Sequence, residues 1–132
     1  MTIKDFEKLK EDDKIYVVNR FSDNPHSHRI VENHIVYIEN GYVYLSEYND
    51  NDWISEYSFD EKINALVECN VVGIKDVAFI TMDEALKYKE REILKKWWRN
   101  SISRYYCPYS LEQLKAVKNI LEKEVIGNER KV

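Results

Sequence analysis

The order of hydrophobic and polar positions divides the chain into a β-rich first part and a helical second part. Alternating apolar and polar positions flank Asn40–Gly41, a pair typical of a two-residue turn, and predict a hairpin over residues 29–48. Shorter β-rich runs predict three further strands, at residues 14–21, 53–59 and 76–81. So many short strands close together favour a meander that curls into a small barrel or a strongly bent sheet.

The alternation also predicts which side of the hairpin faces the core, because successive side chains of a strand point to opposite faces. We expect the core side to consist of Val36, Ile38, Val43 and Leu45. The opposite side would then hold Ile35, Tyr37, Glu39, Tyr42 and Tyr44.

Helical spacing appears at both ends of the chain. Thr2 is a suitable N-cap for a short helix over residues 3–11, and residues 60–73 leave room for another. Two capping boxes, Thr81 to Glu84 and Ser110 to Gln113, predict the starts of two longer helices on either side of Pro108. We expect these helices at residues 82–105 and 111–125, the second ending before Gly127.

These elements predict an α+β fold: a small curled antiparallel sheet, with an SH3-like barrel as one form, followed by a C-terminal helical pair. A chain of 132 residues is one domain in length, so we expect a single domain over residues 1–132. Within it, residues 1–81 are mainly β and acidic, and residues 82–126 are helical and basic.

The junction between the last predicted strand and the first long helix resembles a known group. In short proteins of Gram-positive bacteria and their phages, a phenylalanine–x–threonine strand ends a sheet, and a capped threonine–x–x–glutamate–alanine helix follows. The matching residues here are Phe79, Thr81, Glu84 and Ala85. The resemblance covers nothing past Tyr88. It implies a fold and a phage or mobile-element context, but no activity.

Charge is distributed unevenly. Residues 1–86 hold 8 Lys and Arg against 18 Asp and Glu, whereas residues 87–132 hold 12 against 6. An acidic body with a basic C-terminal third can orient a charged partner, pair within one fold, or pair between two copies. A homodimer therefore stays open as an alternative.

Two surfaces combine charge with aromatic rings, which is the pattern of a binding surface. The first is an acidic rim around a predicted hairpin tip: Glu47, Tyr48, Asp50, Asp52, Trp53 and Glu56. The second is a basic-aromatic helix: Arg91, Lys95, Lys96, Trp98, Arg99 and Arg104. On a helical wheel Met82, Leu86, Ile93 and Trp97 form the core stripe, and Trp98 lies at the seam between apolar and basic faces.

Signatures of catalysis and metal binding are missing from the sequence. It has no phosphate-binding glycine loop, nucleophile elbow or zinc-protease motif. His26, His28, His34 and Cys69 do not complete a tetrahedral set, so no metal and no cofactor is expected. Cys107 is interpreted as a helix-end thiol. No apolar run approaches the roughly 20 residues of a membrane span, and the N-terminus has no signal core, which favours a cytoplasmic protein.

The sequence thus favours a non-enzymatic module that binds another protein through the acidic rim. Together with the resemblance, it favours a phage or mobile-element inhibitor of a host defence protein. The alternative is a single-stranded nucleic-acid-binding protein that uses the basic-aromatic helix over residues 91–106.

Overall fold

The computed structural model describes residues 1–20, 24–48, 53–101 and 109–130, with side chains described up to residue 100 and over residues 109–121. It consists of two compact units, Met1–Lys89 and Glu90–Val132. The prediction of a single domain stays a prediction.

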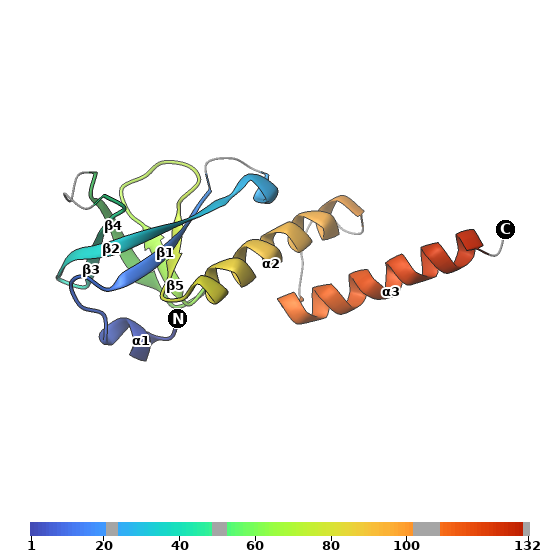
Figure 1. The fold of residues 1–132 in the computed structure, drawn as a ribbon, viewed down its shortest axis with the longest axis horizontal. Coiled ribbons are helices and arrows are strands. Elements are labelled where there is room, and N and C mark those ends of the chain that lie inside the picture. Colours follow the sequence, from blue (N-terminus) through green and yellow to red (C-terminus); the bar gives the residue numbers. More distant parts are fainter. Residues whose placement is uncertain (21–23, 49–52, 102–108, 131–132) are drawn as a thin grey trace. The chain divides into compact units, whose positions relative to one another are not determined.

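The first unit is built on a closed antiparallel barrel, in which β1 pairs with both β2 and β6 (Figure 1). This confirms the predicted small α+β fold with an SH3-like barrel. The described strands are β1 (Lys14–Asn19), β2 (Arg29–Glu39), β3 (Tyr42–Ser46), β4 (Ser55–Asp60), β5 (Ala65–Glu68) and β6 (Val77–Phe79). Two short helices, α1 (Ile3–Glu7) and the 3-10 turn η1 (Pro25–Ser27), flank them.

The β2–β3 hairpin turns at Asn40 and Gly41, as predicted. Both residues have positive φ, of 53° and 80°, which a two-residue turn of this kind requires and which Asn and Gly tolerate best. The turn holds the register in which Glu39 lies opposite Tyr42.

A β-bulge in β2 corrects the predicted core side of this strand. The register with β3 shifts between Ile35 and Tyr37, so that Ile35 pairs with Leu45 and is fully buried, whereas Val36 is only half-buried. Ile38 pairs with Val43 but is 38% exposed. The choice of Val43 and Leu45 is confirmed. Ile38 lies on the same side of the sheet as its partner Val43, at a partly exposed position. The choice of Val36 is wrong, because the extra residue of the bulge reverses the alternation of sides, so that Ile35 takes the core position instead.

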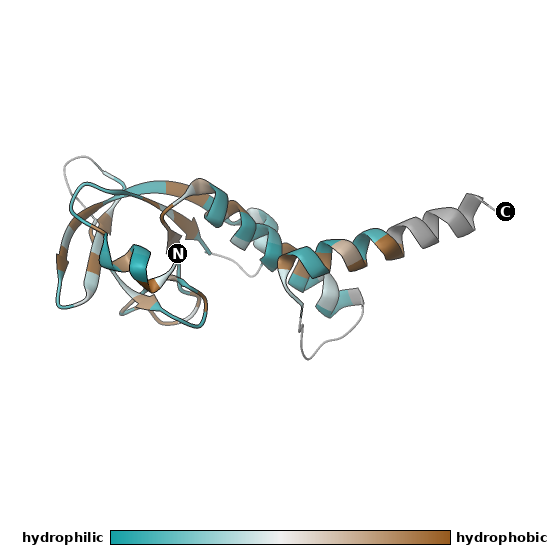
Figure 2. Cartoon of the chain, turned by 90° about the horizontal axis from the view of Figure 1, so that it is seen from below, coloured by the Kyte–Doolittle hydropathy of each residue, from teal (hydrophilic) through white to brown (hydrophobic). Residues whose placement is uncertain are grey.

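The barrel interior is filled by one residue or more from every strand. Figure 2 shows the corresponding pattern of brown and teal residues along the strands. The buried members of this cluster are Met1, Ile15, Val17, Ile35, Val43, Leu45, Tyr57, Leu66 and Ala78. Phe6 and Leu9 pack against the cluster from the N-terminal segment, and the Phe6 ring stacks on Phe59 at 5.3 Å between centroids.

The long helix α2 (Met82–Ser101) covers part of the barrel exterior with its first turns. Ala85 is fully buried and joins a second cluster with Val18, Ala65, Val77 and Phe79. Tyr88 packs against this cluster, and its hydroxyl accepts a hydrogen bond of 2.9 Å from Arg20. The outer sides of β1, β5 and β6 are therefore the sides that α2 covers.

The junction of β6 and α2 contains the predicted Thr81 cap, because the backbone N–H of Glu84 donates to Thr81 Oγ1 at 3.2 Å. The Glu84 carboxylate accepts from the Thr81 hydroxyl and pairs with the α-ammonium group of Met1. One side chain thus connects the N-terminus to the start of α2 next to the barrel core.

Several predicted boundaries are wrong. The first helix ends at Glu7 and not at residue 11. Residues 60–73 form a turn and β5 and no helix, because Leu66 faces the barrel interior as a strand residue. The last helix, α3 (Leu111–Arg130), continues past Gly127, since a glycine inside a helix costs only about 1 kcal/mol and ends it only when its φ is positive. Residues 102–105 of the other predicted helix lie outside the described residues.

The second unit has a small core of its own between the C-terminal half of α2 and the start of α3. Leu94, Leu111 and Leu114 form it, and Trp98 and Tyr109 pack against it. The complete capping box at Ser110 and Gln113 is confirmed by hydrogen bonds of 2.9 and 3.3 Å.

The predicted core stripe of α2 is wrong. Met82 and Leu86 are exposed, the latter by 52%, and Trp97 is half-buried, with the Lys118 Nζ at 5.8 Å from its ring centroid. The reason is that α2 buries Ala85 and Tyr88 in one unit and Leu94 and Trp98 in the other. One apolar stripe along α2 therefore does not contain the residues that are buried in both units.

Candidate protein-binding surface on the barrel

Three neighbouring strands bring one row of polar and aromatic side chains together on the outer side of the barrel. In the register, Tyr37 of β2 lies opposite Tyr44 of β3, which lies opposite Glu56 of β4. The two tyrosine rings stack with their centroids 4.2 Å apart and their planes at 15°. Residues of one row in a sheet are close neighbours, so the carboxylate lies beside the stacked rings.

Hydrogen bonds fix the position of the Glu56 carboxylate. Its Oε1 accepts from the Tyr44 hydroxyl at 3.0 Å, and its Oε2 accepts from the side-chain amide of Asn70. The bond from the hydroxyl raises the pKa of Tyr44 to about 12, with smaller contributions from burial and from the charges of Glu56 and Glu39. The carboxylate is therefore held in place before any ligand arrives.

A second row adds another ring and another carboxylate. Glu39 pairs with Tyr42, which pairs with Ser58, and Tyr42 is 41% exposed. We call Tyr37, Glu39, Tyr42, Tyr44 and Glu56 the tyrosine–glutamate face. It carries two carboxylates and three rings and contains no cation.

Trp53 is the most exposed large aromatic side chain in the described part of the chain, at 84%. Its backbone has φ of 59°, in the left-handed region that bulky residues rarely adopt. Such a conformation costs about 1 to 3 kcal/mol. The molecule therefore maintains a strained backbone where it exposes its largest side chain to water.

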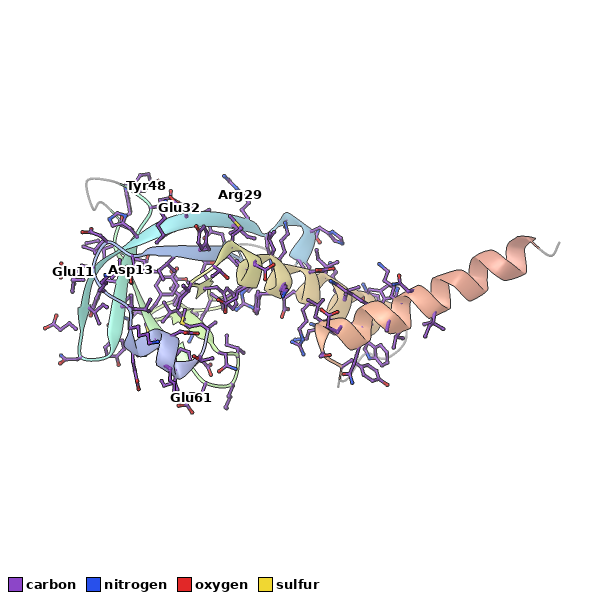
Figure 3. All side chains as sticks on the ribbon, turned by 60° about the horizontal axis from the view of Figure 1, so that its bottom comes forward. Glu11, Asp13, Arg29, Glu32, Tyr48 and Glu61 are labelled. Atoms are coloured by element: carbon purple, nitrogen blue, oxygen red, sulfur yellow. The ribbon has the colours of Figure 1, made fainter. Side chains whose placement is uncertain are left out.

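The predicted acidic rim is placed in part. Glu47, Tyr48 and Trp53 are exposed in the connection between β3 and β4, and Figure 3 shows Tyr48 beside this connection. The Tyr48 backbone N–H donates to Ser46 Oγ at 3.1 Å, which fixes the start of the connection. Glu56 lies within β4, in the tyrosine–glutamate face. Asp50 and Asp52 lie outside the described residues.

A groove of about 590 Å³ adjoins the face on the outer side of β4 and β5. Asn70, which binds Glu56, is one of its walls. Cys69 donates to the Ser58 hydroxyl at 3.4 Å within it. Its lining includes Ser58, Val67, Cys69, Asn70, Lys62 and Lys75.

Much of the predicted basic-aromatic helix takes part in the packing of the second unit. Arg91 donates to the Tyr109 carbonyl at 3.4 Å, and Lys95 pairs with Glu92 at 3.5 Å. Trp98 meets the Tyr109 ring edge-on, with centroids 5.0 Å apart, so its predicted seam position is a packing position.

The remaining basic residues of that prediction differ in exposure. Lys96 is half-buried and Arg99 is exposed. Arg104 and Cys107 lie outside the described residues.

The three histidine side chains differ in solvent exposure. His26 is exposed, His34 half-buried and His28 buried. Within the described part of the chain, no cluster of three or more His, Cys, Asp or Glu side chains is arranged to hold a metal ion. Among the described helices, none combines the length and apolar character needed to cross a membrane.

Sequence reasoning did not single out the tyrosine–glutamate face. The signal was present, because Tyr37, Glu39, Tyr42 and Tyr44 all lie on the side assigned away from the core. Their meeting with Glu56 depends on the pairing of β3 with β4. Comparison with family models, curated proteins and solved structures found no match to this chain.

Proposed function

We propose that this protein is a non-enzymatic module that binds another protein through the β3–β4 connection and the tyrosine–glutamate face. Trp53 carries the proposal, because a strained backbone that exposes a tryptophan lowers stability without any gain inside the fold. Tryptophan is among the residues that most often dominate the binding energy of protein interfaces.

The chemistry of the surroundings fits a basic partner. Glu47 and Tyr48 are exposed in the same connection as Trp53, and the face adds Glu39 and Glu56. Rings provide contact area, and carboxylates provide attraction at a distance and orientation on contact. Residues 79–85 resemble the strand-to-helix junction of phage proteins. This resemblance supports a host protein, such as a defence component, as the target.

The experiment is affinity capture from lysates of candidate host bacteria, analysed by mass spectrometry at low and high salt. We expect a protein that Trp53→Asn and Glu47→Lys no longer capture, while Arg99→Glu captures it as before. Asn tolerates positive φ, so Trp53→Asn keeps the backbone conformation. Capture of a protein that is equally strong with the parent protein, Trp53→Asn and Glu47→Lys would contradict the proposal.

The same samples test the alternative of nucleic-acid binding. If the purified protein retains nucleic acid, and Arg99→Glu with Lys96→Glu releases it, the basic-aromatic helix is the functional surface and the proposal fails. Contacts within the second unit engage Arg91, Lys95 and Trp98, which weakens support for that alternative.

A further inference from the structure

The tyrosine–glutamate face and the groove beside it form one continuous surface. Glu56 belongs to the face, and Asn70, its hydrogen-bond partner, lines the groove. Ser58 connects the two as well, because it pairs with Tyr42 and also lines the groove. A single bound segment could therefore contact both.

We propose that this surface binds an extended polypeptide segment of the partner and receives an arginine side chain of that segment on the Tyr37–Tyr44 ring stack and against the Glu56 carboxylate. The inference rests on the proposed function and specifies the chemistry of the partner.

The negative charges beside the tyrosine stack favour a bound cation. Glu56 and Glu39 both lie close enough to affect Tyr44, and the face contains no Lys or Arg. A cation over a tyrosine ring is attracted by the ring, and here the carboxylate lies at the edge of the same ring. The two attractions therefore act on one group.

The geometry favours arginine over lysine. A guanidinium group is planar, so it can stack on a ring and donate two hydrogen bonds to a carboxylate. The Tyr44 hydroxyl and the Asn70 amide already hold the carboxylate from its two oxygens, which leaves lone pairs in a fixed position. Tyr37 remains 36% exposed despite the stack, so the aromatic pair is accessible.

The groove accommodates the residues that flank the arginine. Its lining combines apolar Val67 with the polar side chains of Ser58, Cys69 and Asn70, which suits an extended backbone with small side chains. The groove is also lined by charges of both signs, Lys62 and Lys75 together with Asp60, Glu61 and Glu68, so it suits uncharged residues beside the arginine better than a second charged one. One arginine next to small polar residues is the segment that matches both parts.

The test uses short labelled peptides of Gly, Ser and Thr that contain one central arginine, lysine or citrulline, with affinity measured by fluorescence polarisation. Citrulline keeps the shape of arginine and removes its charge. We expect the arginine peptide to bind about fivefold more tightly than the citrulline peptide, the sum of a cation–ring contact and an exposed ion pair. The lysine peptide should lie between them.

Glu56→Gln should remove the difference between arginine and citrulline, since it keeps the shape and hydrogen-bond acceptor but not the charge. Glu11→Gln, at an exposed carboxylate between α1 and β1 that belongs neither to the face nor to the groove (Figure 3), is the matched control and should leave the difference unchanged. Amide chemical shifts of Tyr37, Tyr44 and Asn70 should move on titration with the arginine peptide.

Equal binding of the three peptides, or a difference that survives Glu56→Gln, would overturn the inference. The proposed function fails separately: if Trp53→Asn abolishes capture of a protein partner and Glu56→Gln does not, the module stands and the arginine site falls. Concentration-dependent self-association abolished by Glu56→Gln would instead identify a second copy as the occupant and also overturn it.

Discussion

The hydroxyl of Tyr44 donates a hydrogen bond of 3.0 Å to the carboxylate of Glu56 across the β3–β4 pair. This contact connects the aromatic stack to the charge of the tyrosine–glutamate face. It also raises the pKa of Tyr44 to about 12, because removal of the proton would break the bond and place two negative charges side by side.

The first prediction follows from that contact. In Glu56→Gln the Tyr44 pKa should fall toward its ordinary value of 10, since the amide removes the adjacent charge. NMR of tyrosine labelled at Cζ, with the Tyr44 signal assigned from Tyr44→Phe, measures it directly. Between the two pKa values, the Tyr44 signal of the parent protein should remain that of the phenol. Ionisation of Tyr44 at the same pH in both proteins would show that the bond does not form.

The second prediction concerns the backbone at Trp53. Because Asn and Gly occupy positive φ at low cost, Trp53→Gly and Trp53→Asn should raise the free energy of unfolding by about 1 kcal/mol. Urea titration followed by circular dichroism measures the change. The same variants should lose partner capture, so stability and binding should change in opposite directions. Destabilisation by both variants would place Trp53 in a structural role.

The third prediction uses Glu68, which pairs with buried Tyr57 at one end of the barrel. Burial raises the pKa of Glu68, and the charge of Asp76 adds to this, while a hydrogen bond from the Asp76 N–H opposes it. A carboxyl with a raised folded-state pKa binds its proton more tightly when folded. Its contribution to stability is therefore present below the unfolded-state pKa and is lost as pH rises through the folded-state pKa.

Glu68→Gln should accordingly be more stable than the parent protein at pH 7, by less than about 1 kcal/mol because water screens the partly exposed group. The advantage should disappear as pH falls below the unfolded-state value. Thermal unfolding at a series of pH values tests this, and Glu61→Gln is the control at an exposed position. A Gln variant that loses stability at neutral pH would contradict it.

The fourth prediction compares one substitution at two degrees of burial. Leu66 is fully buried inside the barrel, whereas Leu86 on α2 is exposed. Leu66→Ala should lower the free energy of unfolding by about 3 kcal/mol, and Leu86→Ala by less than about 0.5 kcal/mol. A similar loss of unfolding free energy in both variants would contradict the exposed position of Leu86.

The sequence was sufficient for the architecture where local signals are strong. Asn40 and Gly41 specify a turn that few other residues can form, and the Ser110–Gln113 box specifies a helix start, so both were predicted correctly. The capped junction at Thr81 was equally readable.

What the sequence did not reveal depends on pairing between distant segments. The bulge that turns Ile35 inward has no sequence signature, and it alone decides that Val36 is not a core residue. The buried face of α2 changes along its length because Ala85 and Leu94 belong to different clusters, which no single periodicity expresses. For the same reason Glu56 was assigned to a loop rim and not to the tyrosine stack.

Photo-cross-linking in producing cells, from a benzoylphenylalanine placed at position 53 and with position 86 as the exposed control, tests whether the β3–β4 connection binds a protein. We expect a discrete protein adduct from position 53, reduced by Glu47→Lys, and none from position 86. An absence of protein adducts from position 53, together with nucleic-acid adducts from the same probe at position 99, would contradict the proposed function.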